Sequence, residues 1–421
     1  MNTSDLPEAV IEYLSTNRAE LSALTETIVG YDTQNPPGCT ADVVEWLVDI
    51  GDEPALSAER FEVDPKKPNL LLTLAGQTDD TLCFNGHIDT VPFDESDWSY
   101  DPLGEREENR IYGRGTTDMK GAVAAMLQVA LAYARTGVRP PMNLSFAFVS
   151  DEEIGGDAGM KTLLQTTDFS PDACVVGETT SRNDRYSVSV ADRGHIWLTI
   201  EAQGTAAHGS RPMIGENAID RLTGAIDQLR SDFGTCELSV DSAMDPIIEE
   251  SVRFYSPEAG TDPARQLYGY PTINLGVLEG GTAINTVPAS ACAKVDIRLT
   301  AGVETTEIIQ SIRSCLSETA GIKLTDMSWT CGTYERMNSP IVKASASAAE
   351  RVVEDRVYCR SATGGGDAKS LRREGIPTVE FGFGTQTAHS TDEYTTATAL
   401  ARNVTAYAAL PYEYALSLIP L

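Results

Sequence analysis

Three short apolar segments of the chain run directly into acidic or histidine side chains. The segments, each with the side chains that follow it, are 82–84 with His87 and Asp89, 143–149 with Glu152 and Glu153, and 173–176 with Glu178. An alanine-rich segment at 122–134 separates the first two and predicts a buried helix. Strands and helices alternating at this spacing predict an α/β fold with a mostly parallel sheet. Because ligands gather at the carboxyl ends of strands in such sheets, we expect a site there.

His87 and Asp89 stand two residues apart at the end of a predicted strand. Side chains two apart on a strand face the same way, so the imidazole and the carboxylate project together. A metal-bound histidine usually donates its second ring N–H to a carboxylate, which fixes its tautomer. The pair can therefore supply a metal ligand and the group that orients it. Taken alone, the motif is equally that of ordinary polar residues at a strand exit.

Five side chains at strand ends and glycine turns make a candidate set of metal ligands. They are His87, Asp118, Glu153, Glu178 and His389. Two imidazoles and three carboxylates, one of them bridging, suit two zinc-like ions about 3.5–4 Å apart. The whole chain has only 4 histidines, and a random scatter of core histidines would not place two of them in this set.

The pattern of the remaining segments indicates two domains, as the length of 421 residues also does. Helices are predicted in 5–29, 43–50, 345–353 and 399–410, and a strand at 375–381. From about residue 186 the predicted strands are 188–190, 196–202, 272–278 and 291–299, with one helix at 218–229. We therefore expect a metal-binding catalytic domain formed by 1–186 and 302–421. An α+β insert at 187–301 with its own sheet would separate these two parts, with a helix from Glu304 returning the chain to the first domain.

The charge of the chain excludes some partners. The formal net charge is -30 and the isoelectric point is about 4.4, so nucleic acid and anionic membranes would be repelled. The carboxylates are dispersed, and lysine is scarce at 8 against 24 arginines. This composition is typical of proteins from halophilic archaea; an acidic enzyme from an ordinary organism is the alternative.

Other sequence features concern the compartment. No apolar stretch reaches the roughly 18 residues that cross a membrane. The first residues lack a basic segment followed by an apolar one, so we expect no secretion signal and a cytoplasmic protein. The 8 cysteines stand apart without C-x-x-C spacing, and several lie in apolar runs, as buried thiols in a reducing compartment do.

The order of the motifs resembles a known family, the co-catalytic zinc exopeptidases and deacylases. This family includes aminoacylase, acetylornithine deacetylase, succinyl-diaminopimelate desuccinylase and the glutamate carboxypeptidases. The matching segments are 86–92 (GHIDTVP), 113–121 (GRGTTDMKG), 151–155 (DEEIG), 204–208 (GTAAH), 285–288 (NTVP) and 388–393 (AHSTDE). Any one of them is moderate support, and all six in order span most of the chain.

The resemblance implies a role for each matching residue. His87 and Glu178 would bind one metal, Glu153 and His389 the other, Asp118 would bridge both, Asp89 would orient His87, and Glu152 would be the general base. The implied cofactors are two divalent ions, zinc or alternatively cobalt. The resemblance also implies that the insert at 187–301 acts as a lid and dimerisation domain, through which a homodimer forms.

Residues outside this set are assigned by the same resemblance. His208 would stabilise the oxyanion of the tetrahedral intermediate, from its own subunit or the partner's. Asn285 and Arg298 would hold a substrate carboxylate, with a structural salt bridge as the alternative for Arg298. Gly365 and Gly366 would belong to a glycine-rich substrate loop. Two residues depart from the family: Phe383 replaces a common proline, and His195 matches no ligand position, so we expect it to be structural.

The predicted reaction is hydrolysis of the amide bond of an N-acyl amino acid or short peptide. Bound zinc lowers the pKa of its water from about 15.7 towards 7, giving a hydroxide nucleophile. Glu152 would take the proton and pass it to the leaving amine. We favour the acetylornithine or succinyl-diaminopimelate kind, within amino-acid biosynthesis, and a dipeptidase or carboxypeptidase is the alternative. A non-catalytic metal-containing binding protein is the alternative of another class; Glu152 argues against it, because it is not needed to hold metal.

Overall fold

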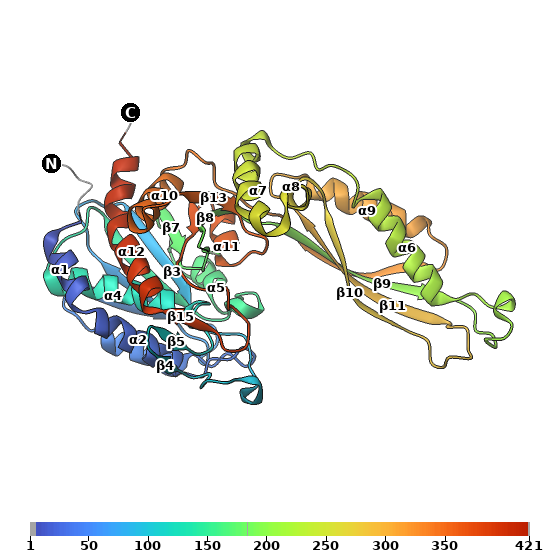
Figure 1. Ribbon diagram of the computed structural model, residues 1–421, viewed down its shortest axis with the longest axis horizontal. Helices are drawn as coiled ribbons and strands as arrows, with labels where there is room; N and C mark the ends of the chain where they lie inside the picture. The colour runs from blue at the N-terminus through green and yellow to red at the C-terminus, as the bar shows by residue number, and fades with distance from the viewer. Residues whose placement is uncertain (1–5, 183, 420–421) are drawn as a thin grey trace. The chain divides into compact units, whose positions relative to one another are not determined.

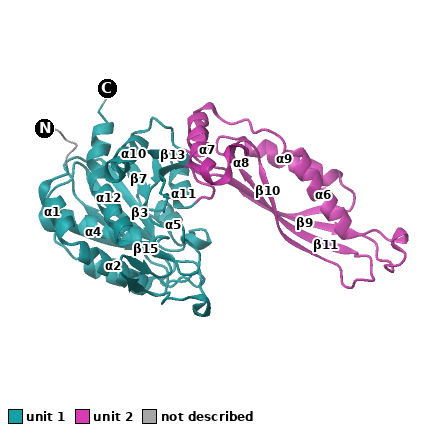
Figure 2. Cartoon of the chain, viewed as in Figure 1, with its two compact units in different colours: residues 1–190, 335–360, 366–421 teal, residues 191–334, 361–365 magenta. Residues whose placement is uncertain are grey.

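The computed structural model describes residues 6–182 and 184–419, so Asp5, at the start of the first predicted helical region, lies outside it. The chain divides into two compact units (Figures 1 and 2). The first unit comprises the described parts of residues 1–190, 335–360 and 366–421. The second unit comprises residues 191–334 and 361–365. Each unit has its own sheet and its own core.

An eight-stranded sheet forms the centre of the first unit. Its strands in spatial order are β1 (Leu56–Phe61), β2 (Asn69–Leu74), β6 (Asn143–Val149), β3 (Thr81–His87), β7 (Ala173–Val176), β14 (Thr378–Glu380), β8 (Tyr186–Ala191) and β13 (Val357–Ser361). The four central strands β6, β3, β7 and β14 run parallel, whereas β1, β2 and β8 pair antiparallel with their neighbours. The α/β fold expected from the sequence is confirmed, with antiparallel strands at the margins of a parallel centre.

Helices cover both faces of this sheet. They are α1 (Glu8–Thr16), α2 (Arg18–Val29), α3 (Ala41–Ile50), α4 (Lys120–Thr136), α5 (Met160–Thr166), α10 (Pro340–Val353), α11 (Asp367–Arg373) and α12 (Ala397–Ser417). On one face Phe84 stacks on Phe146 and contacts Tyr407 of α12. On the other face Cys83 and Cys174 pack against α5 and α11. Successive strand residues thus serve opposite faces, as the period of two requires.

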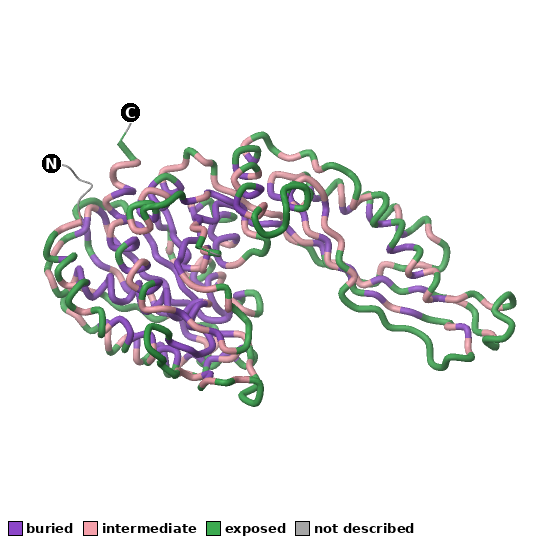
Figure 3. The backbone as a smooth tube through the Cα atoms, in the orientation of Figure 1, coloured by how far each residue is buried: buried purple, intermediate pink, exposed green. Residues whose placement is uncertain are grey.

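Helix α4 lies close to the strands that carry the predicted site. Its residues are buried from Lys120 to Tyr133, and Figure 3 shows the buried segments gathered along this helix and the central strands. A Cβ atom on Gly86 would come within 2.8 Å of Val123, and one on Gly177 within 2.5 Å of Met126. Glycine at these two positions therefore lets α4 approach the ends of β3 and β7. This approach brings Asp118, just before the helix, to the same edge of the sheet.

A small antiparallel sheet and several short helical turns complete the elements. The sheet has the order β15 (Tyr394–Thr396), β5 (Arg110–Tyr112) and β4 (Glu105–Glu107). The 3₁₀ turns are η1 (Glu95–Asp97), η2 (Glu152–Ile154), η3 (Pro212–Ile214) and η4 (Ser242–Met244). None of the helices in the described part of the chain is both long and apolar enough to cross a bilayer. The cysteines are all free thiols, of which Cys83, Cys174 and Cys359 are buried.

The second unit contains a four-stranded antiparallel sheet with helices on one face. The strands in spatial order are β10 (Thr272–Gly280), β11 (Ser290–Leu299), β9 (Gly194–Gln203) and β12 (Ile322–Thr330). The helices are α6 (Ala218–Asp232), α7 (Asp245–Ala259), α8 (Thr261–Gly269) and α9 (Thr305–Glu318). Alternate residues of β9 and β11 are buried in a core with α6 and α9. The other face of this sheet carries the exposed Trp197.

The expected end of the insert at residue 301 is wrong. Helix α9 packs its buried residues into the core of the second unit and does not return the chain to the first unit. Strand β12 then pairs with β9, so the second unit continues to Tyr334. Strand β12 was not expected, because the alternation that starts at Ile322 and Leu324 breaks at Asp326, where the register with β9 shifts. The expected strand 375–381 is also shorter, at Thr378–Glu380.

Candidate metal centre

Three adjacent parallel strands bring their carboxyl ends together at one edge of the first sheet. Strand β3 ends at His87, which pairs in register with Val149, the last residue of β6. The turn η2 with Glu152 and Glu153 follows β6, and Glu178 comes two residues after the end of β7. The period of each strand and the parallel order together place these side chains at the same edge.

Asp118 lies between two imidazoles at this edge. Its Oδ1 is 3.1 Å from Nε2 of His87, and its Oδ2 is 3.0 Å from Nε2 of His389. Glu178 Oε1 lies 3.4 Å from the same His87 nitrogen, and Glu153 Oε2 lies 3.4 Å from the same His389 nitrogen. The structure therefore brings all five predicted ligand side chains together. They form two groups of three that share Asp118.

The donor atoms of these groups fit divalent ions. His87 Nδ1 lies 3.0 Å from the backbone oxygen of Asp89, which can only accept, so Nδ1 carries the proton and Nε2 is free to bind metal. Oε1 of Glu153 is buried without a hydrogen-bond partner. Ligand atoms of His87, Asp118 and Glu153 lie within 4.8 Å of one another. A mixed nitrogen and carboxylate set of this kind suits zinc-like ions.

Without a bound cation these groups hold protons in place of one. Hydrogen bonds to Asp118 and Glu153 raise the pKa of His389 to about 10. Burial, together with the charge of Asp118, raises the pKa of Glu178 to about 8. Burial acts to raise the pKa of Asp118, but the two imidazoles outweigh it and hold that pKa well below its usual range. The cluster thus concentrates negative charge where a cation can bind.

A buried glutamate fixes the segment that carries Asp118. The Glu393 carboxylate accepts hydrogen bonds from Arg114 (2.7 Å) and from the backbone N–H groups of Gly115, Thr117 and Asp118 (2.9–3.1 Å). Glu393 stands four residues after His389, so one side chain ties together two segments that carry ligands. The sequence motif contained Glu393, but its role was not predicted, because only the three-dimensional contacts reveal which amides it accepts from.

Glu152 lies beside the cluster and has a different environment from Glu153. Burial, with the charges of Asp367, Glu178 and Glu153, raises its pKa well above the usual range. A Cβ atom on Gly366 would lie 2.7 Å from Glu152 Oε1, so a larger residue at this position would displace the Glu152 carboxylate. A glutamate that holds a proton next to the candidate ligands has the chemistry of a general acid–base.

The comparison with known proteins decides the family. Residues 83–413 match peptidase family M20/M25/M40. The chain belongs to this family. It is therefore a hydrolytic enzyme of the metallopeptidase and deacylase type, as the sequence resemblance indicated.

The M20 chain resembles curated and solved relatives along most of its length. It is 28% identical to acetylornithine deacetylase from Vibrio atlanticus over 364 residues, covering 84% of this chain and 85% of that protein. It shares the fold of an M20 family metallo-carboxypeptidase from Sulfolobus solfataricus, with a TM-score of 0.77, 18% identity and coverage of 94% and 99%. It also shares the fold of the Bacillus subtilis protein YXEP, described as a dinuclear metal-binding peptidase, with a TM-score of 0.61, 14% identity and coverage of 94% and 98%.

Most of the other predicted residues of this M20 chain lie in the second unit. His208 and Asn285 are close, because Gly209 N–H donates to the Asn285 backbone oxygen at 2.6 Å. Nε of Arg298 donates to both carboxylate oxygens of Asp296, at 2.9 and 3.0 Å. The salt bridge that was the alternative for Arg298 is therefore present. Gly365 also belongs to this unit, whereas Gly366 belongs to the first.

Both departures from the family pattern have local partners. The backbone N–H of Phe383 donates to Asn403 Oδ1 at 2.7 Å, a bond that proline cannot make. His195 stacks on Trp197 with ring centroids 4.3 Å apart and lies 3.2 Å from the Thr330 hydroxyl. These contacts agree with a structural place for both side chains.

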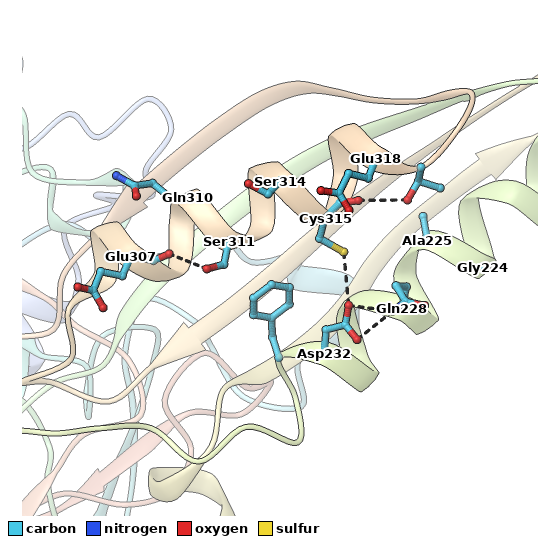
Figure 4. Close-up of a pocket in the computed structure, with 12 residues that line it drawn as sticks. Gly224, Ala225, Gln228, Asp232, Glu307, Gln310, Ser311, Ser314, Cys315 and Glu318 are labelled. Carbon is cyan, nitrogen blue, oxygen red and sulfur yellow. Dashed lines mark hydrogen bonds between the residues drawn. The ribbon is translucent and has the colours of Figure 1, made fainter.

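A broad groove between α6 and α9 of the second unit contains none of the predicted site residues. Figure 4 shows its lining of small and polar side chains, among them Gly224, Ala225 and Ser311. The thiol of Cys315 lies 3.8 Å from Asp232 Oδ2 in this groove. The lining offers no set of metal ligands and no histidine, so this groove is not part of the candidate metal centre.

Proposed function

We propose that the chain hydrolyses the amide bond of an N-acyl amino acid, in the manner of acetylornithine deacetylase or succinyl-diaminopimelate desuccinylase. The observation that carries the proposal is Asp118 held between the imidazoles of His87 and His389, beside the buried Glu152. His87, Asp118 and Glu178 would hold one divalent ion, and His389, Asp118 and Glu153 the other. Zinc is the proposed metal, with cobalt as the alternative.

The chain's own residues supply proton transfer and orientation. When bound, the ions supply Lewis acidity and lower the pKa of water at the site to about 7. Glu152 takes the proton of the attacking water and returns it to the nitrogen of the leaving amine. Asp89 fixes the position of His87 and of the turn that carries Glu152.

Residues of the second unit complete the proposal. His208 would donate a hydrogen bond to the developing oxyanion, from its own or the partner subunit. Asn285 and Arg298 would hold the substrate carboxylate, for which Arg298 must share its guanidinium with Asp296. The second unit would also serve as a lid and as the surface of a homodimer. We place the protein in the cytoplasm of a halophilic organism, on the basis of its charge and cysteine content.

The choice of substrate rests on the relatives. The acetylornithine deacetylase of Vibrio atlanticus supports a deacylase, because the two sequences match over most of both chains. The fold of the Sulfolobus metallo-carboxypeptidase keeps a carboxypeptidase or dipeptidase as the second candidate. Both candidates use the same proposed ligands and base, and they differ in the acyl group that the site accepts.

A substrate panel tests the proposal. Purified protein loaded with zinc or cobalt is assayed on acetylornithine, succinyl-diaminopimelate and a set of dipeptides, at low and at molar salt. We expect the largest kcat/KM on an N-acyl amino acid, and no turnover by Glu152→Gln. A preference for dipeptides would select the second candidate. Hydrolysis of no substrate by protein with two bound ions would favour a non-catalytic binding protein.

A further inference from the structure

The turn that carries Glu152 and Glu153 begins with a residue in an unusual conformation. Asp151 has a φ of 70°, in the left-handed region that residues other than glycine seldom adopt. The Asp151 side chain is nearly buried and accepts bonds from three parts of the chain. Its Oδ2 accepts from the N–H of Ala158 at 3.1 Å, and its Oδ1 accepts from Asn35 at 3.1 Å and pairs with Nζ of Lys67.

Asn35 connects this turn to the residue that orients His87. Its Nδ2 lies 2.8 Å from Oδ2 of Asp89 and 3.1 Å from Oδ1 of Asp151, and its Oδ1 accepts from Lys67 at 3.3 Å. Asn35 is 1% exposed, so these contacts are shielded from water. The amide of one asparagine therefore bridges two carboxylates that flank the candidate centre.

Asp89 connects Asn35 to the backbone of both Glu152 and Glu153. Its Oδ1 accepts from the N–H of Glu152 at 3.1 Å, and its Oδ2 accepts from the N–H of Glu153 at 3.2 Å. One carboxylate thus fixes the backbone of a candidate base and of a candidate ligand. A shift of Asp89 or of the turn would move both residues relative to His87.

We propose that Lys67 and Asn35 are positioning residues that hold, through Asp151 and Asp89, the turn carrying Glu152 and Glu153. The inference rests on the proposed function for its kinetic consequence, although the contacts themselves do not. Nζ of Lys67 pairs with Oδ1 of Asp151, so the positive charge of Lys67 compensates the negative charge of Asp151. The two side chains are only 13% and 6% exposed, so water contributes little to this compensation. Loss of Lys67 would leave a buried carboxylate uncompensated at the residue where the backbone is already unfavourable.

The test compares Lys67→Met with Lys67→Arg and with the matched control Lys66→Met. Lys66 directly precedes Lys67 in the chain, and its side chain is exposed. Hydrogen exchange of residues 150–158 is measured in the metal-free protein, followed by kcat, KM and bound metal in the loaded protein. For Lys67→Met we expect faster exchange confined to this segment and a kcat reduced about 10- to 100-fold with KM little changed. Lys67→Arg should recover most of both values, and Lys66→Met should match the wild type.

The outcomes distinguish failure of the positioning role of Lys67 from failure of the proposed function. Exchange of 150–158 in Lys67→Met equal to that in Lys66→Met would overturn the positioning role, whatever happens to kcat. A wild type that hydrolyses nothing on the panel would defeat the proposed function, and the exchange result would still decide whether Lys67 holds the turn. If Lys67→Met does not fold, the double variant Lys67→Met with Asp151→Asn removes both charges, and asparagine tolerates the left-handed backbone. Wild-type exchange in that variant would also overturn the proposal.

Discussion

Glu152 and Glu153 are adjacent, yet their surroundings assign them to different tasks. Glu153 lies 3.4 Å from His389 within the ligand cluster. Glu152 instead lies beside Gly366, and the negative charge of Asp367 is among the causes that raise its pKa. Adjacent residues can diverge in this way because the 3₁₀ turn η2 rotates successive side chains apart. The backbone of a single turn therefore gives the proposed ligand and the proposed base their different surroundings.

Substitution of these two glutamates should separate catalysis from metal binding. We expect Glu152→Gln to keep both ions and to lose turnover by about 10²- to 10⁴-fold, because the amide cannot accept the proton. Glu153→Gln is the matched control and should bind less metal. Initial rates and metal content of the purified variants provide the measurement. Loss of metal from Glu152→Gln equal to that from Glu153→Gln would show that Glu152 is a ligand.

The stability of the metal-free protein should fall with rising pH. The pKa of His389 is raised from 6.5 to about 10, so its contribution is complete below pH 6.5 and is lost as the pH rises through 10. The pKa of Glu178 is raised from 4.5 to about 8, so its protonated form stabilises the fold at low pH and is lost through pH 8. Thermal unfolding of chelated protein from pH 6.5 to 10 should show the fall. Ion-loaded protein should show a smaller one, because the ions replace these protons; equal falls would contradict the prediction.

At the scale of elements, Glu393 links the loop before α4 to the segment of His389. Four donors satisfy this buried carboxylate, and three of them are backbone N–H groups. A backbone held in this way leaves Asp118 little freedom to turn from the cluster. The three-stranded sheet β15–β5–β4 adjoins this link: β5 precedes the loop that carries Asp118, β15 follows Glu393, and the two strands pair with each other.

Glu393→Gln should weaken metal binding more than it weakens the fold. The amide group can donate where the carboxylate accepted, so some of the N–H groups lose their partner and Asp118 is held less firmly. We expect metal affinity to fall about 10- to 100-fold, as it does when groups behind ligands are replaced. Competition with a chelator measures this. Glu413→Gln, at a buried carboxylate paired with Arg351 on α10, is the control and should leave affinity unchanged.

Local patterns in the sequence predicted the elements that depend on local order. His87, Glu153 and Glu178 follow apolar strands, and the period of two placed them correctly at one edge. Asp118 and His389 follow no such strand; they were collected from turns in the sequence, and the family resemblance supported their place in the set. Lys67 and Asn35 lacked any signal, since their partners lie 32 to 116 residues away in the chain. Strand β12 was missed because pairing with β9, not its own pattern, makes it a strand.

At the scale of the whole molecule, the net charge of -30 governs stability in solution. Dispersed carboxylates repel one another, and salt shortens the range of this repulsion from about 10 Å at 0.1 M to about 3 Å at 1 M. We therefore expect the melting temperature of the wild type to rise between 0.1 and 1 M potassium chloride. The same scan at pH 4.5, where many carboxylates are protonated, is the control and should show a smaller rise. A melting temperature independent of salt at pH 7 would contradict the proposed halophilic origin.

Because Asp118 lies between the imidazoles of His87 and His389, the two proposed metal positions would not be filled independently. An ion beside His87 would use the same carboxylate that an ion beside His389 would require, so the binding of either ion would affect the binding of the other. Replacement of Asp118 by asparagine should accordingly strip both cations, whereas replacement of Glu178 should release one. The number of bound ions per chain in these two variants would show whether the two ions bind independently or together.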